Sequence, residues 1–426
     1  MSLLILSYSK ELELRYNADV IVAGGGPAGF AAAVMCARQG RSVILVEQSG
    51  SVGGASVLAG VAEFMNFDDG KSFLCKGIGR EVFELAGYRC RFEREWYNIH
   101  TEKIKRIYDS LLEEAGVTVL FYNRVTDVVC TGRKADYLVL SGPEGVCAAK
   151  SDYYVDTTGN GSLCALSGAG YDYGDELGNA MSTTLCSLWG GVDFKRKPRD
   201  ANYYEEAYSD GIFSQYDSVL PGIKANHPNI GVGRGNVGHV FGVDDRSTES
   251  LTNAMFSGRK SVAEYERYYR EYVPGCENAE LISTANYLGI RESRRIHCEY
   301  TLTMDSFYES ASFPDEIGRY SYPVDIHPMT ADTKGMEGFE KAVSLRHSDG
   351  ESYSIPLRCL IPKDLDNVFV AGRCIGADRA MQASTRVIPC CFITGQAAGV
   401  AAAVCAQTGA RAKDTDVSEV RKRLGI

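Results

Sequence analysis

The feature that most constrains the fold of this chain is a strand–glycine–helix pattern close to its N-terminus. Residues 20–23 are an apolar, largely β-branched run, typical of a strand that is buried on both faces. Gly24, Gly26 and Gly29 follow at G-x-G-x-x-G spacing, and residues 28–38 are rich in small apolar side chains. In this order the glycines permit a tight turn, a close approach of backbone to a pyrophosphate, and tight packing of a helix against the strand.

A second apolar run follows and ends in Glu47, about 20 residues beyond the glycines, where an acid can accept a hydrogen bond from a ribose hydroxyl. Pro27 suits the first turn of the intervening helix, because the N–H that proline lacks has no partner at that position. The glycine spacing alone is a weak signal, since glycine-rich turns are common. Strand, glycines, helix, strand and acid in this order predict a dinucleotide site.

Length and charge limit the class of protein. The 426 residues are enough for two or three domains with a large core. A net charge of −10 argues against nucleic acid or an anionic membrane as the main partner. No stretch approaches the roughly 18 apolar residues of a membrane span, and residues 3–6 are too short an apolar run for a signal peptide. We therefore expect a cytoplasmic protein without a membrane span.

The 14 cysteines contain no C-x-x-C pair, so the sequence predicts no metal or iron–sulfur site. Most of them lie among apolar residues, where a free thiol behaves as a small core side chain. Cys390 and Cys391 are adjacent, and a redox disulfide is one interpretation of the pair. Packing is the favoured interpretation, because disulfide reductases carry separated cysteines near the first glycine motif and this chain does not.

Periodic segments outline the order of the chain. Helices are predicted over residues 100–116, 259–272 and 393–404, and strands over residues 117–122, 125–130, 136–140, 153–156 and 367–372. The region from residue 169 to residue 346 is rich in glycine and tyrosine and has little helical periodicity, which favours a sheet.

The predicted fold class is α/β, with a discontinuous Rossmann-like nucleotide-binding domain and an inserted, sheet-rich substrate or cap domain. The first domain is expected to contain a parallel sheet with an antiparallel insert. The boundaries are 17–60, 100–168 and 350–410 for the nucleotide-binding domain, 61–99 and 169–349 for the substrate domain, and 411–426 for a C-terminal tail.

Several runs of the sequence resemble a family of FAD-dependent oxidoreductases with the two-domain architecture of glutathione reductase and fumarate reductase flavoproteins. The runs span residues 19–29, 156–163, 288–296, 323–327, 353–358, 367–375 and 386–399, so the resemblance covers nearly the whole chain. Gly-Ile-Arg-Glu-Ser-Arg from residue 289 and Ala-Gly-Arg-Cys-Ile from residue 371 are distinctive of this family. The chain departs from the family at Asn160 and Ser162, where acids are usual, and at Cys298, where glycine is common.

The resemblance implies that FAD is the cofactor. Carried over onto matching positions, it places FAD against Gly24, Gly26, Pro27, Ala28, Gly29, Glu47, Gln48, Gly53, Gly54, Ala55, Ser56, Val125, Thr158, Gly159, Gly372, Arg373, Gly395, Gln396, Ala397 and Ala398. Within this set, the first three glycines would hold the pyrophosphate, Glu47 the adenosine ribose, and residues 395–398 would lie beside the isoalloxazine. A helix that begins near Pro389 would direct unpaired N–H groups at the flavin and favour its reduced, anionic form.

The candidates for the substrate end of the flavin are Arg291, Arg294, His327 and Arg386. Arg291 or Arg294 would bind a carboxylate as a fork, and His327 would act as an acid or base. The alternative for the arginines is a structural ion-pair network, and a lone histidine is often structural. A second G-x-G-x-x-G motif, at residues 233–238, has neither a preceding strand nor a following apolar helix, so no nicotinamide site is predicted there.

These patterns predict an FAD-dependent oxidoreductase, a dehydrogenase or reductase that transfers a hydride between FAD and a small, carboxylate-bearing or otherwise polar molecule. The alternative is a flavin-dependent monooxygenase or halogenase-type enzyme, in which reduced flavin reacts with oxygen. A flavin-binding protein without catalytic activity is a third interpretation. The sequence specifies neither the substrate, the direction of reaction, the electron acceptor or donor, nor whether the chain forms a homo-oligomer.

Overall fold

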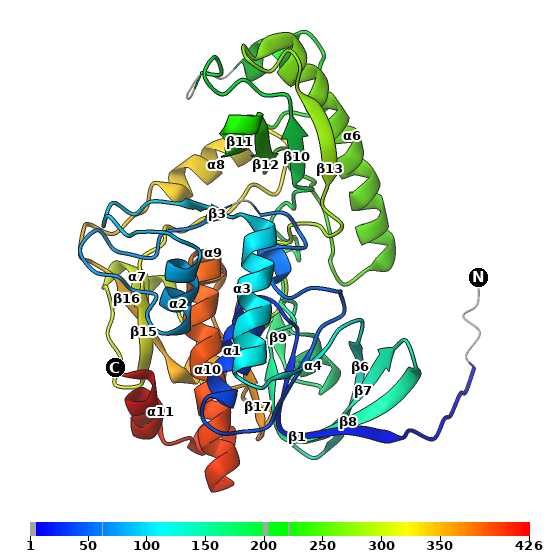
Figure 1. Ribbon diagram of the computed structural model, residues 1–426, viewed down its shortest axis with the longest axis vertical. Coiled ribbons are helices and arrows are strands. Elements are labelled where there is room, and N and C mark those ends of the chain that lie inside the picture. The colour runs from blue at the N-terminus through cyan, green and yellow to red at the C-terminus, as the bar shows by residue number, and fades with distance from the viewer. Residues whose placement is uncertain (1–5, 62, 199–202, 220–221) are drawn as a thin grey trace.

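The computed structural model describes residues 6–61, 63–198, 203–219 and 222–426 (Figure 1). Residues 3–5 of the N-terminal apolar run lie outside the described residues. Figure 1 shows a lower body, in which helices cover a large sheet, and an upper body that contains the long helix α6 (Thr248–Tyr272). The lower body combines the N-terminal and C-terminal parts of the chain, and most of the upper body comes from the part between them.

A seven-stranded sheet forms the centre of the lower body. Its strands lie in the order β5-β2-β1-β8-β7-β6, and β17 also pairs with β8. Strands β5, β2, β1, β8 and β17 run parallel to their neighbours in this group, whereas β6, β7 and β8 form an antiparallel meander. The bounds are β1 Leu14–Ala23, β2 Val43–Val46, β5 Thr118–Leu120, β6 Arg124–Thr131, β7 Lys134–Gly142, β8 Gly145–Asp156 and β17 Val368–Val370. The predicted α/β class, with a parallel sheet and an antiparallel insert, is confirmed.

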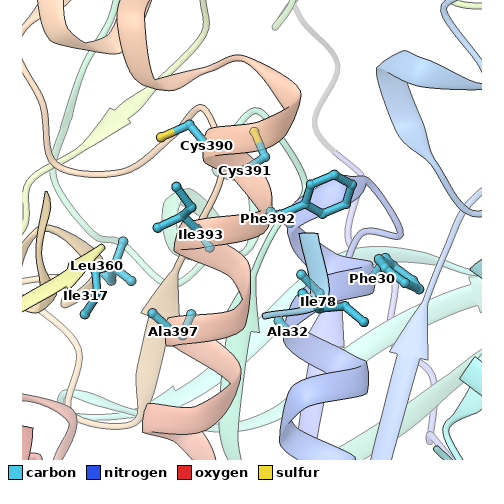
Figure 2. Close-up of a cluster of buried hydrophobic side chains, with 14 of the residues drawn as sticks. Phe30, Ala32, Ile78, Ile317, Leu360, Cys390, Cys391, Phe392, Ile393 and Ala397 are labelled. Carbon is cyan, nitrogen blue, oxygen red and sulfur yellow. The ribbon is translucent and has the colours of Figure 1, made fainter. Parts of the chain in front are cut away.

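Two helices of small residues pack against each other beside this sheet. These are α1 (Pro27–Ala37) and α10 (Ile388–Thr408), with α3 (Thr101–Glu114) next to α1. A Cβ on Gly395 would lie 2.7 Å from the Cα of Ala28, and one on Gly399 would lie 2.8 Å from the Cα of Ala32. Figure 2 shows the larger side chains that fill the space around this contact, among them Phe30. The absence of side chains at the two glycines therefore sets how closely α1 and α10 approach.

Helix α10 corrects the expectation that no stretch is long and apolar enough to span a membrane. It contains an 18-residue window with a mean hydropathy of 1.7, which passes that test by length and composition. The whole window is buried inside the protein, against α1 and the sheet. It is the one such helix among the described residues, and its place is that of a core helix.

The lower body also contains segments that the sequence interpretation assigned to the second domain. Within residues 61–99, the chain forms β3 (Glu63–Phe64), α2 (Ile78–Leu85) and β4 (Tyr97–Asn98), and Phe64, Phe67 and Phe83 are buried in the same core as α1 and α10. The core also takes in α7 (Met304–Tyr308) and the paired strands β15 (Glu316–Tyr320) and β16 (Tyr353–Pro356). The sequence does not indicate that residues 61–99 belong to this core, because the inward-facing aromatic residues are interspersed with charged ones and show no clear period.

The upper body has a separate core. Its four-stranded antiparallel sheet has the order β11-β12-β10-β13, and Trp189 of this sheet packs edge-on against Tyr269 of α6. The bounds are β10 Ser187–Gly190, α5 Tyr204–Ser209, β11 Ile223–His227, β12 Val232–Gly235 and β13 Glu280–Thr284. Helix α6 starts well before the predicted residue 259, because Ser247 caps it by accepting a hydrogen bond from the Ser250 N–H.

The second glycine motif begins in strand β12, inside this antiparallel sheet. It therefore lacks the strand–turn–helix setting of a nucleotide-binding turn. The remaining elements are α4 Ser162–Leu166, β9 Tyr171–Asp172, β14 Arg295–Ile296, α8 Thr333–Val343, α9 Arg379–Thr385, α11 Val417–Leu424, and the 3₁₀ helices η1 Gly54–Ser56, η2 Pro228–Ile230, η3 Leu357–Leu360 and η4 Ala412–Asp414.

Candidate functional site

The turn between β1 and α1 has the shape that a pyrophosphate-binding turn requires. Gly24 has a φ of +98°, and a Cβ there would lie 2.6 Å from the carbonyl oxygen of Thr157. A Cβ on Gly29 would lie 2.6 Å from the hydroxyl oxygen of Thr157, whereas Gly26 faces open space. Gly26 precedes α1 without a side-chain cap, so the first N–H groups of the helix are left for another acceptor.

Glu47 holds this turn from the end of β2. One carboxylate oxygen accepts a hydrogen bond from the Gly25 N–H at 2.7 Å, and the other accepts from the Ser49 N–H at 2.8 Å. The side chain is buried, and each carboxylate oxygen keeps a second lone pair. The carboxylate can therefore accept from a ribose hydroxyl as well, and Glu47 fits the predicted ribose contact.

The second predicted glycine pair lies directly against this turn. The Gly53 N–H donates to the Gly25 carbonyl oxygen at 2.7 Å, and a Cβ on Gly54 would lie 2.9 Å from the Cα of Gly26. Gly53 and Gly54 both have positive φ, of +126° and +47°. The two glycine segments thus form one continuous backbone surface at the N-terminus of α1.

Two further predicted segments meet at the same place. A Cβ on Gly372 would lie 3.2 Å from the Cβ of Ala28, and the Gly159 carbonyl oxygen accepts a hydrogen bond from Arg373 Nε. Four distant parts of the chain therefore surround the start of α1, and this arrangement fits the pyrophosphate of FAD. The other predicted contacts lie on the same or adjoining segments: Pro27 begins α1, Gln48 is exposed after β2, Ala55 and Ser56 lie in η1, Thr158 follows β8, and Val125 is buried in β6.

Residues 395–398 are packed inside the protein. Gly395 packs on the backbone of Ala28, the Gln396 side-chain oxygen accepts from the Ile78 N–H at 3.2 Å, and Ala397 and Ala398 are fully buried. Their small side chains are explained by helix packing. The part of α10 that presents uncapped N–H groups is its first turn, after the N-cap residue Val387. A contact of residues 395–398 with the isoalloxazine stays a prediction.

A row of mostly buried polar side chains connects two of the catalytic candidates. Arg386, at the end of α9, donates to Asp325 Oδ2 at 2.9 Å, and Asp325 Oδ1 lies 3.2 Å from His327 Nε2. His327 Nδ1 lies 2.8 Å from His239 Nε2, and His239 Nδ1 lies 2.8 Å from Asp217 Oδ1. We call these five residues the histidine row. The structure thus brings His327 and Arg386 together through one carboxylate.

Burial and close neighbours set the charges in the histidine row. Burial alone would raise the pKa of Asp325, but His327 and Arg386 outweigh it and hold this pKa well below its usual value. Burial also acts to raise the pKa of Asp217, and His239 more than offsets it. Both carboxyls are therefore ionised. Burial lowers the pKa of both histidines, and the positive charge of Arg291 adds to this effect.

Arg291 is a buried cation next to the histidine row. It donates to the Ser182 carbonyl oxygen at 3.0 Å and to Asn236 Oδ1 at 3.3 Å, and it is 6% exposed. Burial lowers the pKa of Arg291 to about 10, and repulsion from Arg386 contributes. Among the described residues, no carboxylate lies within ion-pair distance of this guanidinium. A buried guanidinium in this state is suited to bind an anion.

Arg294 makes its contacts with other residues than the histidine row, and its role as a substrate ligand stays a prediction. Its guanidinium donates to the Asn160 carbonyl oxygen at 3.0 Å and lies 5.0 Å from the ring centre of Tyr171. The neighbouring Glu292 carboxylate is paired with two arginines, since it accepts from Arg295 Nη1 at 2.6 Å and from Arg379 Nε at 3.0 Å. The charged run therefore contains both a structural ion-pair network and a candidate ligand, Arg291.

Sequence reasoning missed Asp217, His239 and Asp325. A signal existed for Asp325, because it precedes His327 by two residues and alternate residues of an extended chain point to the same side. No local pattern marks the other two residues. They come from loops far from His327 in sequence and reach it only through the fold.

The adjacent cysteines are buried free thiols at the start of α10. Figure 2 shows their sulfur atoms pointing in different directions, because successive residues of a helix are about 100° apart around its axis. Burial raises the pKa of the Cys391 thiol to about 12, and this thiol donates to the Arg386 carbonyl oxygen at 3.3 Å. These observations favour the packing interpretation.

The parallel sheet, the glycine turn and Glu47 define the class of protein as a Rossmann-type dinucleotide-binding protein. The chain belongs to the FAD dependent oxidoreductase family, whose model matches residues 19–424. FAD is therefore its cofactor, and the protein is an enzyme. The glycine turn, Glu47 and the uncapped start of α1 are residues that can hold that cofactor.

Several known proteins are similar to parts of this chain. A thiamine thiazole synthase of Pyrococcus horikoshii is 25% identical over 171 residues, which is 38% of this chain and 65% of that protein, slightly under two thirds. A urocanate reductase of Eggerthella lenta is 47% identical over 49 residues, which is 12% of this chain and 8% of that protein. A geranylgeranyl bacteriochlorophyll reductase-like protein of Thermoplasma acidophilum shares the fold, with a TM-score of 0.50 at 10% identity over 96% of this chain and 82% of that one.

Proposed function

We propose that this enzyme transfers a hydride between a small carboxylate-bearing molecule and its FAD. The observation that supports this most strongly is Arg291, a buried guanidinium without an ion-pair partner among the described residues. Two polar atoms on residues that contact Arg291, Ser182 Oγ and Gln382 Oε1, are buried and lack a hydrogen-bond partner in the described part of the chain. A cation without a carboxylate partner, together with unsatisfied polar atoms on residues that contact it, suits a polar, anionic ligand.

The residues around this position have separate roles in the proposed reaction. FAD, when bound, supplies the acceptor or donor of the electron pair. Arg291 binds the substrate carboxylate, and Asp325 holds Arg386 as a second cation beside it. His327 holds a proton on its ring for the substrate atom that gains or loses one. The relatives whose names state a reductase or a synthase are compatible with this reading, but they match too little of the chain to select it.

The test uses the flavin as its own reporter. Holoenzyme is mixed anaerobically with small hydroxy acids, and the photoreduced enzyme with small unsaturated acids, each beside its uncharged amide, while stopped-flow absorbance follows the flavin. We expect one acid to react and its amide to fail. Arg291→Gln should weaken the binding of that acid by roughly 10–150-fold, the equivalent of about 1.5–3 kcal/mol for a charged hydrogen bond. Arg294→Gln is the matched control.

Two results would contradict the proposal. In one, the amide reacts as well as the acid, or Arg291→Gln behaves like Arg294→Gln. In the other, no acid changes the flavin, but the photoreduced enzyme consumes oxygen in a reaction that depends on an added organic substrate. The second result would assign the monooxygenase or halogenase-type activity instead.

A further inference from the structure

The protons of the histidine row can be counted from its hydrogen bonds. Asp217 and Asp325 are ionised, and an ionised carboxylate only accepts hydrogen bonds. His239 Nδ1 is hydrogen-bonded to Asp217 at 2.8 Å and therefore carries a proton, and the ion-pair contact of His327 Nε2 with Asp325 at 3.2 Å favours a proton on that nitrogen as well. The two nitrogens that remain, His239 Nε2 and His327 Nδ1, face each other at 2.8 Å.

Two neutral imidazole rings make this contact unfavourable. A neutral ring carries one N–H, and in both rings that N–H already points at a carboxylate. The inner nitrogens would then meet lone pair to lone pair at hydrogen-bond distance. Two imidazolium rings are excluded for the converse reason, since two N–H groups would point at each other. The contact needs one proton between the rings, which places three protons on the four ring nitrogens.

We propose that His239 and His327 share one proton, so that the pair carries a single positive charge between Asp217 and Asp325, and that the substrate exchanges this proton at His327. The second half rests on the proposed function, whereas the sharing itself does not. His239 is fully buried and His327 is 6% exposed, so His327 is the ring that a substrate can reach. Asp217 and His239 are positioning residues that act through His327.

The proposed step balances in both directions. When the substrate is reduced, it gains a hydride and the shared proton, and the histidine pair becomes neutral. The facing lone pairs of that neutral state favour the return of a proton from water. In the direction of substrate oxidation, the pair first releases its shared proton to water; the substrate then gives up a hydride and a proton, and the pair takes up that proton and regains its charge. The electron pair is exchanged with FAD in either case.

The groups around the pair agree with one shared proton. Those that face it or its carboxylates are Arg291 before β14, Arg386 after α9, Tyr322 after β15, Tyr265 of α6 and the apolar ring of Phe339 in α8. Burial lowers the pKa of both histidines and so opposes any extra proton, whereas Asp217 raises the pKa of His239 and Asp325 raises the pKa of His327. With one shared proton, the two arginines and the pair exceed the two carboxylates by one positive charge. A singly charged anion would neutralise that excess, so we expect a monocarboxylate to be preferred.

Asp217→Asn is the variant that removes the charge and preserves the contacts. In the protein, Asp217 Oδ2 accepts from the His239 backbone N–H, and Oδ1 faces His239 Nδ1. An asparagine can accept at the first position and donate from its amide nitrogen at the second. His239 would then carry its proton on Nε2 and donate to His327, so the contact between the two rings would be satisfied with both rings neutral. Tyr265→Phe is the control, because it removes a buried hydroxyl near Asp217 that has no hydrogen-bond partner among the described residues.

The measurement is NMR of the FAD-loaded enzyme with nitrogen-15 in its histidine rings. The chain has six histidines, and single variants of the other four assign the signals. We expect three N–H protons on the two rings, one of them far downfield and coupled to nitrogens of both rings. In Asp217→Asn both rings should become neutral at unchanged FAD content, while Tyr265→Phe should keep the wild-type pattern. Wild-type rings that are both neutral or both fully protonated would overturn the sharing, even if Asp217→Asn failed to fold.

A second readout separates this inference from the proposed function. Loss of a positioned acid or base costs typically 10²–10⁴-fold in rate, and we expect Asp217→Asn to slow the flavin reaction with the carboxylate by roughly 10²-fold. FAD content and carboxylate affinity should change much less. If the wild type shares the proton but Asp217→Asn reacts at an unchanged rate, the proposal that the substrate exchanges this proton at His327 is wrong. Absence of any reacting carboxylate would contradict the proposed function while the NMR result still decided the sharing.

Discussion

The contact between α1 and α10 predicts that Gly395→Ala is destabilising, although alanine is the better helix former. A Cβ at this position would lie 2.7 Å from the Ala28 Cα and still closer to the Ala28 carbonyl oxygen, against about 3.4 Å for an ordinary contact, so the helices must separate by more than about 0.7 Å. Both sides of the contact are backbone, and no flexible side chain can move away. We take about 3 kcal/mol, the upper end of the usual cost of overpacking, less about 1 kcal/mol for the helix propensity of alanine.

The net loss of about 2 kcal/mol can be measured by urea unfolding at a fixed FAD concentration. If the chain unfolds as one unit, an unfolding entropy of about 2.1 cal/mol/K per residue makes the fall in melting temperature about 2 °C. Ala28 belongs to the first turn of α1, so we also expect weaker retention of FAD. Gly338→Ala in the exposed helix α8 is the matched control, because a Cβ there meets no atom within 4 Å, and it should be neutral or stabilising. Equal effects of the two variants would refute the close approach of α1 and α10.

Four further predictions concern the cofactor and the site. Glu47→Ala should weaken FAD binding by about 1.5–3 kcal/mol in a fluorescence titration, and an unchanged affinity would mean that Glu47 does not touch the ribose. NADH and NADPH should reduce the flavin slowly, because the second glycine motif begins in an antiparallel strand; fast, saturable reduction would contradict this. Reductive titration should take two electrons per FAD, and four would indicate that Cys390 and Cys391 take part. His327 and Arg386 hold the pKa of Asp325 below its unfolded value of about 3.9, so this carboxyl stabilises the fold above about pH 4 and its contribution is lost as the pH falls further. Melting temperatures should therefore fall less steeply on acidification in Asp325→Asn than in the wild type.

The nucleotide turn was predictable because its requirements are local. Gly24, Gly26 and Gly29 serve a turn, an open approach and a helix contact within one short segment, and Glu47 follows on the next strand. Each requirement leaves a residue type at a fixed spacing. The same holds for the sheet, whose strands appear as apolar runs.

The histidine row was not predictable because its requirements are spread over the chain. Asp217 and His239 precede Asp325 and His327 by about a hundred residues, and Arg386 follows a further helix. A pattern search in the sequence has no spacing to detect, since loops of any length can deliver such residues to one place. The place of residues 61–99 in the core was hard to predict for a related reason. Phe64 and Phe67 belong to the core of the lower body, and the charged residues around them broke the period that would have revealed it.

The charged run from Arg291 to Arg295 explains how a buried cation can stay available for a ligand. Arg291 lies next in sequence to a carboxylate, Glu292, and a free carboxylate there would compete with any bound anion. Glu292 is instead occupied by Arg295, by Arg379 and by the Met181 N–H at 2.9 Å. Those partners occupy Glu292, so it does not reach Arg291, and within the described part of the chain the Arg291 guanidinium donates only to neutral oxygens. The sequence left open whether this run forms structural ion pairs or binds a ligand. In the fold, the ion pairs of Glu292 leave Arg291 available to bind a ligand.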